Sequence, residues 1–85
     1  MKTQNLTTQK NRILSSVQSR TFSRFQRKLK EKVPDYHIAW VHPVKENMIE
    51  VGLESKNKMT YRKTLQAARA AIEVEDKTGV FVILF

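Results

Sequence analysis

The sequence predicts an α+β fold, a two-layer sandwich in the order α-β-β-α-β. Three observations carry this prediction: helical apolar periodicity that stops at Pro34, two short alternating stretches separated by a turn, and six apolar residues at the end of the chain. The 85 residues suit one small domain. We therefore expect residues 12–85 to form a single domain, with a three-stranded sheet and a long basic amphipathic N-terminal helix. Residues 1–11 are expected to be a flexible segment.

The first helix is expected over residues 12–33. Its apolar side chains recur every three to five residues, and most of them fall within an arc of about 100° on a helical wheel. Pro34 ends the helix, because the residue before a proline resists the α-helical region. The apolar arc, which we expect to face the core, consists of Leu14, Phe22, Phe25, Leu29 and Val33, whereas Val17 lies outside it.

Two strands are expected over residues 36–44 and 48–54, joined by a short turn. Strict alternation puts Ile38 and Trp40 on one face of the first strand, where Trp40 is expected to join the core. A hairpin that is buried on one face is the simplest arrangement. In the second strand, Ile49, Val51 and Leu53 then share one face, and Met48, Glu50, Gly52 and Glu54 share the other.

A second helix is expected over residues 60–77, with Thr60 as its N-cap and Gly79 just past its end. Residues 80–85 are apolar and rich in β-branched side chains, which favours a strand covered on both faces. The strand order stays open, because the first and third strands are both apolar enough to be central. The predicted apolar stripe of this helix consists of Tyr61, Leu65, Ala68 and Ile72.

The charge of the chain is concentrated in its first part. The sequence has 16 Lys and Arg against 8 Asp and Glu, a formal net charge of +8. Residues 1–33 contain nine basic residues and one acid, whereas residues 34–85 contain seven of each. Such an asymmetry is typical of proteins that bind nucleic acid or another anionic surface.

Basic side chains on one face of the first helix predict contact with a phosphate backbone, where counterion release supplies the free energy. No set of residues that could read bases is evident, so RNA or DNA would be recognised by shape and charge. We expect a small non-enzymatic nucleic-acid-binding protein of the cytoplasm. The predicted nucleic-acid-binding residues are Lys10, Arg12, Arg20, Arg24, Arg27 and Lys28.

The same basic segment supports other functions. A protein-interaction module, such as an assembly factor or a regulatory inhibitor, could dock it on an acidic protein partner. Residues 1–30 lack acids and are rich in Ser, Thr, Arg and Lys, which is also typical of a mitochondrial transit peptide. A basic amphipathic helix can lie on anionic lipid, and a run of surface charge can simply keep a small protein soluble.

The sheet predicts a second interaction surface. If both helices pack on one side, the other side is apolar and needs a partner, such as a second copy of the chain in a homodimer. One helix on each side would instead give a three-layer monomer. The predicted partner or self-association surface consists of Ala39, Val41, Met48, Phe81, Ile83 and Phe85.

Residues that could carry catalysis or hold a metal are sparse. There is no cysteine, and the two glycines, Gly52 and Gly79, cannot form a phosphate-binding loop. His37 and His42 are five residues apart on a strand, so we expect them on opposite faces. We therefore predict no metal and no cofactor, and no apolar run is long enough to span a bilayer. The element order is similar to that of a type II KH-like core, but the absence of a Gly-x-x-Gly loop means that no residue role is carried over.

Overall fold

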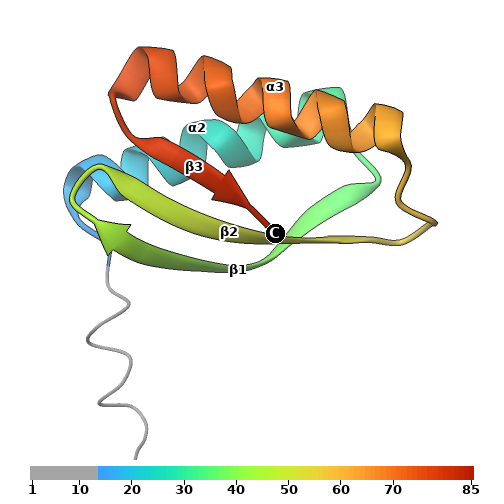
Figure 1. Ribbon diagram of the computed structural model, residues 1–85, viewed down its shortest axis with the longest axis horizontal. Coiled ribbons are helices and arrows are strands. Elements are labelled where there is room, and N and C mark those ends of the chain that lie inside the picture. The colour runs from blue at the N-terminus through green and yellow to red at the C-terminus, as the bar shows by residue number, and fades with distance from the viewer. Residues whose placement is uncertain (1–13) are drawn as a thin grey trace, which may run out of the picture.

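The computed structural model describes residues 14–85 and confirms the predicted α+β fold, with two helices and a three-stranded sheet in two layers (Figure 1). The first helix begins at Ser16 and not at the predicted residue 12, because Ser15 is extended and caps it. The predicted flexible segment 1–11 lies outside the described residues. The elements are α2 (Ser16–Lys32), β1 (Tyr36–Lys45), β2 (Met48–Ser55), α3 (Tyr61–Thr78) and β3 (Phe81–Leu84).

The sheet has the strand order β1-β2-β3, so β2 is the central strand. A tight turn joins β1 to β2, which pair antiparallel, and the α3 crossover brings β3 back parallel to β2. The order that the sequence left open is therefore set by the two connections. β1 and β3 form the two edges of the sheet.

Both helices cover the same face of the sheet, α2 over β1 and α3 over β3 (Figure 1). The core lies between the layers, where the buried side of α2 meets Ile49 and Val51 of β2 and Val74 of α3. The other sheet face, which we call the open face, carries neither helix. The predicted apolar arc of α2 is confirmed: Phe25, Leu29 and Val33 are buried, and Leu14 and Phe22 pack against the core.

The ends of α3 follow the predicted chemistry. The hydroxyl of Thr60 accepts a hydrogen bond from the backbone N–H of Lys63 and so caps the first turn. Gly79 adopts the left-handed conformation, with φ of 77°, and its N–H donates to the carbonyl of Glu75. The chain can then turn sharply from α3 into β3.

The predicted apolar stripe of α3 is wrong about which side of the helix is buried. Tyr61 is 82% exposed and Ile72 is 57% exposed. The helix instead turns a face of small side chains toward the sheet, because small residues let the two backbones approach closely. The buried residues of α3 are Ala67, Ala70, Ala71 and Val74.

An irregularity in the register of β1 overturns the predicted position of Trp40. Ile38 lies opposite Leu53 and Trp40 lies opposite Gly52, so Ala39 between them has no partner of its own. One extra residue reverses the alternation of a strand. Trp40 therefore leaves the helix-covered face and lies on the open face, where it is 38% exposed and not part of the core.

Candidate nucleic-acid interface

The first turn of α2 fixes how the helix is rotated on the sheet. Ser15 and Gln18 form a capping box: the Ser15 hydroxyl accepts from the Gln18 N–H (3.1 Å), and the Gln18 side-chain oxygen accepts from the Ser15 N–H (2.8 Å). The Gln18 side-chain amide also donates to the carbonyl of Lys45, at 2.7 Å. These bonds join α2 to the end of β1, so the apolar arc points inward and the opposite side faces solvent.

Three arginines lie on that solvent-facing side of α2, as the sequence predicts for Arg20, Arg24 and Arg27. Among residues 14–85, none of the three guanidinium groups forms an ion pair. They line a shallow hollow of about 460 Å³ together with three serines. We call these six residues the Arg-Ser surface: Ser16, Ser19, Arg20, Ser23, Arg24 and Arg27.

Sequence reasoning missed the serines of the Arg-Ser surface, although the signal was present. Ser16, Ser19 and Ser23 are spaced by three and four residues, the spacing that keeps side chains on one helical face. The arginines are spaced by four and three residues, which keeps them on one helical face in the same way. Serine hydroxyls and guanidinium groups both donate hydrogen bonds to phosphate oxygens, so the two sets supply one kind of chemistry on one surface.

Lys28 does not share the position of the three arginines. Its ammonium lies 3.1 Å from a carboxylate oxygen of Glu73 on α3, and the Lys32 ammonium lies 3.5 Å from the other oxygen. The hydrogen bond from Lys28 holds the pKa of Glu73 below its ordinary value of 4.5, and the charge of Lys32 lowers it further. The structure therefore places Lys28 in the contact between the two helices.

The basic character extends from α2 to the end of α3. Arg20 and Arg24 border a second hollow, of about 320 Å³, together with Lys77 and Thr78. Lys77 lies far from the arginines in the sequence, so only the packing of the two helices reveals it. The predicted contacts Lys10 and Arg12 lie outside the described residues.

The predicted self-association surface needs two corrections. Val41 lies opposite Val51 and packs against the core, so it is absent from the open face. Ala39 is the extra residue at the β1 irregularity and has no partner on β2. This extra residue reverses the alternation of the strand, so the predicted placements of Ala39 and Val41 on the open face are both wrong. The register places the other four predicted residues, together with Trp40 and His42, on the open face: Met48, Phe81, Ile83 and Phe85.

The prediction that His37 and His42 lie on opposite faces is wrong for the same reason. The β1 irregularity between them puts both histidines on the open face. His37 is paired with Glu54 and His42 with Glu50, and both glutamates belong to the open face. The His37 ring nitrogen lies 3.1 Å from Glu54, and the His42 ring stacks on Trp40 at 4.7 Å between centroids. In the part of the chain that the structure describes, no group of three or more His, Cys, Asp or Glu could hold a metal ion.

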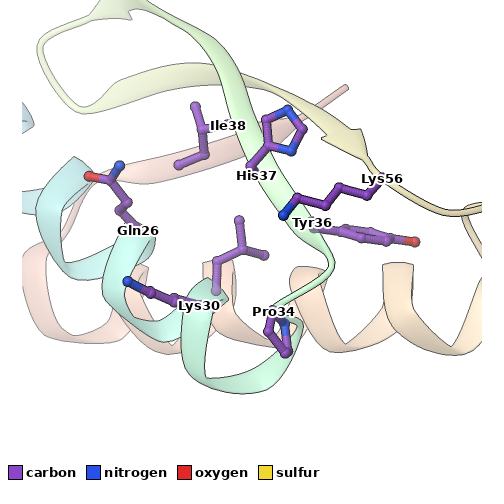
Figure 2. A pocket seen from close by; sticks show the side chains of 8 residues that line it. Gln26, Lys30, Pro34, Tyr36, His37, Ile38 and Lys56 are labelled. Atoms are coloured by element: carbon purple, nitrogen blue, oxygen red, sulfur yellow. The ribbon is translucent and has the colours of Figure 1, made fainter.

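A cavity of about 430 Å³ lies between the end of α2 and the start of β1. Figure 2 shows Lys30 on α2 and Lys56 beyond β2 on opposite sides of it, with Ile38 and Tyr36 contributed by β1. The Tyr36 hydroxyl is already engaged with Thr64, at 2.9 Å. The lining contains no carboxylate, and its titratable residues are Lys30, Tyr36, His37 and Lys56.

Comparison with known proteins returns no matching family model, no matching curated protein and no matching solved structure. Within residues 14–85, neither helix has both the length and the apolar character that crossing a bilayer requires.

Proposed function

We propose that this protein binds nucleic acid through the Arg-Ser surface and has no catalytic role. The observation that carries the proposal is the group of three guanidiniums beside three hydroxyls on one exposed helix face, with no acid paired to them among residues 14–85. All six side chains can donate to phosphate oxygens, and arginine does so with two parallel hydrogen bonds. Binding would release counterions from the phosphates and so weaken steeply with salt.

The spacing of the arginines suits a line of phosphates. Arg20 and Arg27 are separated by seven residues, which is about 10 Å along the helix axis. In duplex DNA each strand advances about 3.4 Å per nucleotide along the duplex axis. With α2 aligned along the duplex axis, the helix face spans about three nucleotides, and each guanidinium can meet a different phosphate group.

The surface favours structured RNA or duplex DNA bound by shape and charge. Phosphate contacts set position and orientation but carry no sequence information. The Arg-Ser surface contains no Asn, Gln or aromatic side chain, and the proposal assigns its arginines to phosphates and not to base edges. We therefore expect similar affinity for unrelated sequences of the same helical form.

Fluorescence anisotropy with labelled RNA and DNA duplexes at low salt tests the proposal. Arg20→Glu, Arg24→Glu and Arg27→Glu together are expected to weaken binding at least a hundredfold without changing the circular dichroism spectrum. The matched control is Lys45→Glu, Lys56→Glu and Lys58→Glu, the same charge change at three exposed lysines elsewhere. Equal losses in both variants, or no binding by the wild type, would refute the proposal.

An acidic protein partner is the competing explanation, because carboxylates also accept bonds from arginine. Competition separates the two. If a nucleic-acid duplex is the ligand, polyphosphate and heparin should displace it at a lower concentration of anionic groups than poly-glutamate requires. Displacement by poly-glutamate at lower concentration would favour the protein partner.

A further inference from the structure

The outer edge of β3 is free to pair with another strand. The N–H groups of Phe81 and Phe85 donate to β2, to the carbonyls of Asn47 and Val51, and the Phe85 carbonyl accepts from Leu53. Backbone groups of a strand alternate in direction, so those of Val82 and Leu84 point away from β2. Within residues 14–85, no strand pairs with this side of β3.

The two edges of the sheet differ in how they are protected. β1 has two register irregularities, one on each side of residues 40–43, and it carries Pro43 and Lys45. Irregularities, proline and lysine are the usual means by which a sheet edge avoids pairing. β3, Phe81–Leu84, has none of these three features and is apolar throughout, so its short length of four residues is its one protection. The difference indicates that another strand pairs with the β3 edge.

The apolar stripe of α3, which is exposed and not buried as predicted, lies beside the β3 edge. Ala68, Ala71 and Ile72 line a largely apolar groove of about 290 Å³ together with residues 82–84, and Glu75 is its one charged residue. Leu65 and Tyr61 continue the stripe along the helix, and all three larger side chains are exposed. Scattered exposed apolar residues need no explanation, but a continuous apolar surface beside a free strand edge marks an interface.

We propose that a second copy of this chain covers this surface, with the two β3 strands antiparallel about a two-fold axis at Ile83. Val82 of one copy would then exchange hydrogen bonds with Leu84 of the other, using the backbone groups that point outward. Phe81 would lie opposite Phe85 on the open face, and Ile72 would lie near its own copy. The result is one six-stranded sheet with an isologous interface. This inference does not depend on nucleic-acid binding.

Charge complementarity on α3 favours a second copy over an unrelated strand. Arg62 and Arg69 occupy the first half of the helix, and Glu75 and Asp76 occupy the second half, with Lys77 as the exception. Among residues 14–85, none of these four forms an ion pair. A two-fold axis makes the two α3 helices antiparallel, so the basic half of each lies beside the acidic half of the other. The Arg-Ser surface is on α2, which lies over β1 at the other edge of the sheet. Its positive charge is therefore not brought together with that of the second copy by the pairing of the two β3 strands.

Sedimentation velocity of the full chain over a range of concentrations tests the pairing. We expect a dimer, and we expect Ile72→Glu to weaken dimerisation at least tenfold while leaving the circular dichroism spectrum unchanged. Val44→Glu is the matched control, because Val44 is also an exposed aliphatic residue but lies near the β1–β2 turn. A monomer at every concentration, or a dimer that Ile72→Glu leaves intact, would overturn the proposal.

Charge exchange tests the antiparallel arrangement. One variant carries Arg62→Glu and Arg69→Glu, and the other carries Glu75→Lys and Asp76→Lys. Each alone is expected to dimerise at least tenfold more weakly than the wild type, whereas a mixture of the two, with one labelled, is expected to form a mixed dimer. Two variants that self-associate as the wild type does, or a mixture that forms no mixed dimer, would contradict it.

Discussion

The indole ring of Trp40 lies over the backbone of Gly52 on the neighbouring strand, so closely that a Cβ atom at position 52 would overlap it. The ring of His42 stacks on the Trp40 indole, and the Phe85 ring lies 5.7 Å from the indole, centroid to centroid. The three aromatic rings thus connect β1 to the end of the chain across the open face. Glycine is required here for space, since its φ is not in the left-handed region.

Gly52→Ala is therefore expected to destabilise the fold by about 1–3 kcal/mol, because the indole must move. Denaturant unfolding, at one fixed protein concentration, measures the change. In a Trp40→Ala background the same substitution should cost little, which gives a measurable coupling in a double-mutant cycle. An equal cost in both backgrounds would show that the contact is not the cause.

Gln18 is a buried polar residue whose hydrogen bonds fix the rotation of α2. Gln18→Ala removes the bond to the Lys45 carbonyl and half of the capping box, and we expect a loss of about 1–3 kcal/mol. Gln18→Glu should also destabilise, because a carboxylate cannot donate to that carbonyl. Gln26→Ala, at an exposed glutamine of the same helix, is the control, and an equal effect at both positions would contradict this role.

Gly79 supplies the left-handed turn between α3 and β3. A Cβ atom at this position would meet open space, so only the backbone conformation opposes a side chain. Gly79→Ala is expected to cost about 1–2 kcal/mol, and Gly79→Asn less, because asparagine tolerates this region better. Thermal unfolding of the three proteins tests the ranking. Alanine that is as stable as glycine would rule out this conformational role.

The contact of Lys28 and Lys32 with Glu73 makes stability depend on pH. Because the pKa of Glu73 is lowered in the folded state, its contribution is present above the ordinary value of 4.5 and is lost as the pH falls through the lowered value. Glu73→Gln should reduce the melting temperature at neutral pH, and the difference should close in strong acid. Glu46→Gln, at an exposed glutamate of the β1–β2 turn, is the control. A difference that persists in strong acid would refute the prediction.

The sequence predicts the elements of this fold well, because Pro34, Thr60 and Gly79 act locally on the backbone. It fails where the outcome depends on contacts between elements. Strict alternation cannot reveal the extra residue at Ala39, which moves Trp40 and His42 to the open face. The apolar residues of α3 are consistent with two different buried faces. The larger side chains of Tyr61, Leu65 and Ile72 favour one face in the prediction, whereas the structure buries the other.

The candidate interface shows the same division. The helical spacing of Arg20, Arg24 and Arg27 predicts their shared solvent-facing side. The position of Lys28 follows from Glu73, which lies 45 residues away on another helix. Lys77 borders the second hollow beside Arg20 and Arg24 for the same reason. Local periodicity places side chains around one helix, but tertiary packing decides which of them remain unpaired.

The central claim, that the three arginines contact phosphates, is tested most directly by the salt dependence of duplex DNA binding. The slope of log binding constant against log salt counts the phosphates neutralised, at about 0.9 per contact. Neutralising all three, by Arg20→Gln, Arg24→Gln and Arg27→Gln, should reduce the steepness by about 3. A slope that matches the wild-type value would contradict the account.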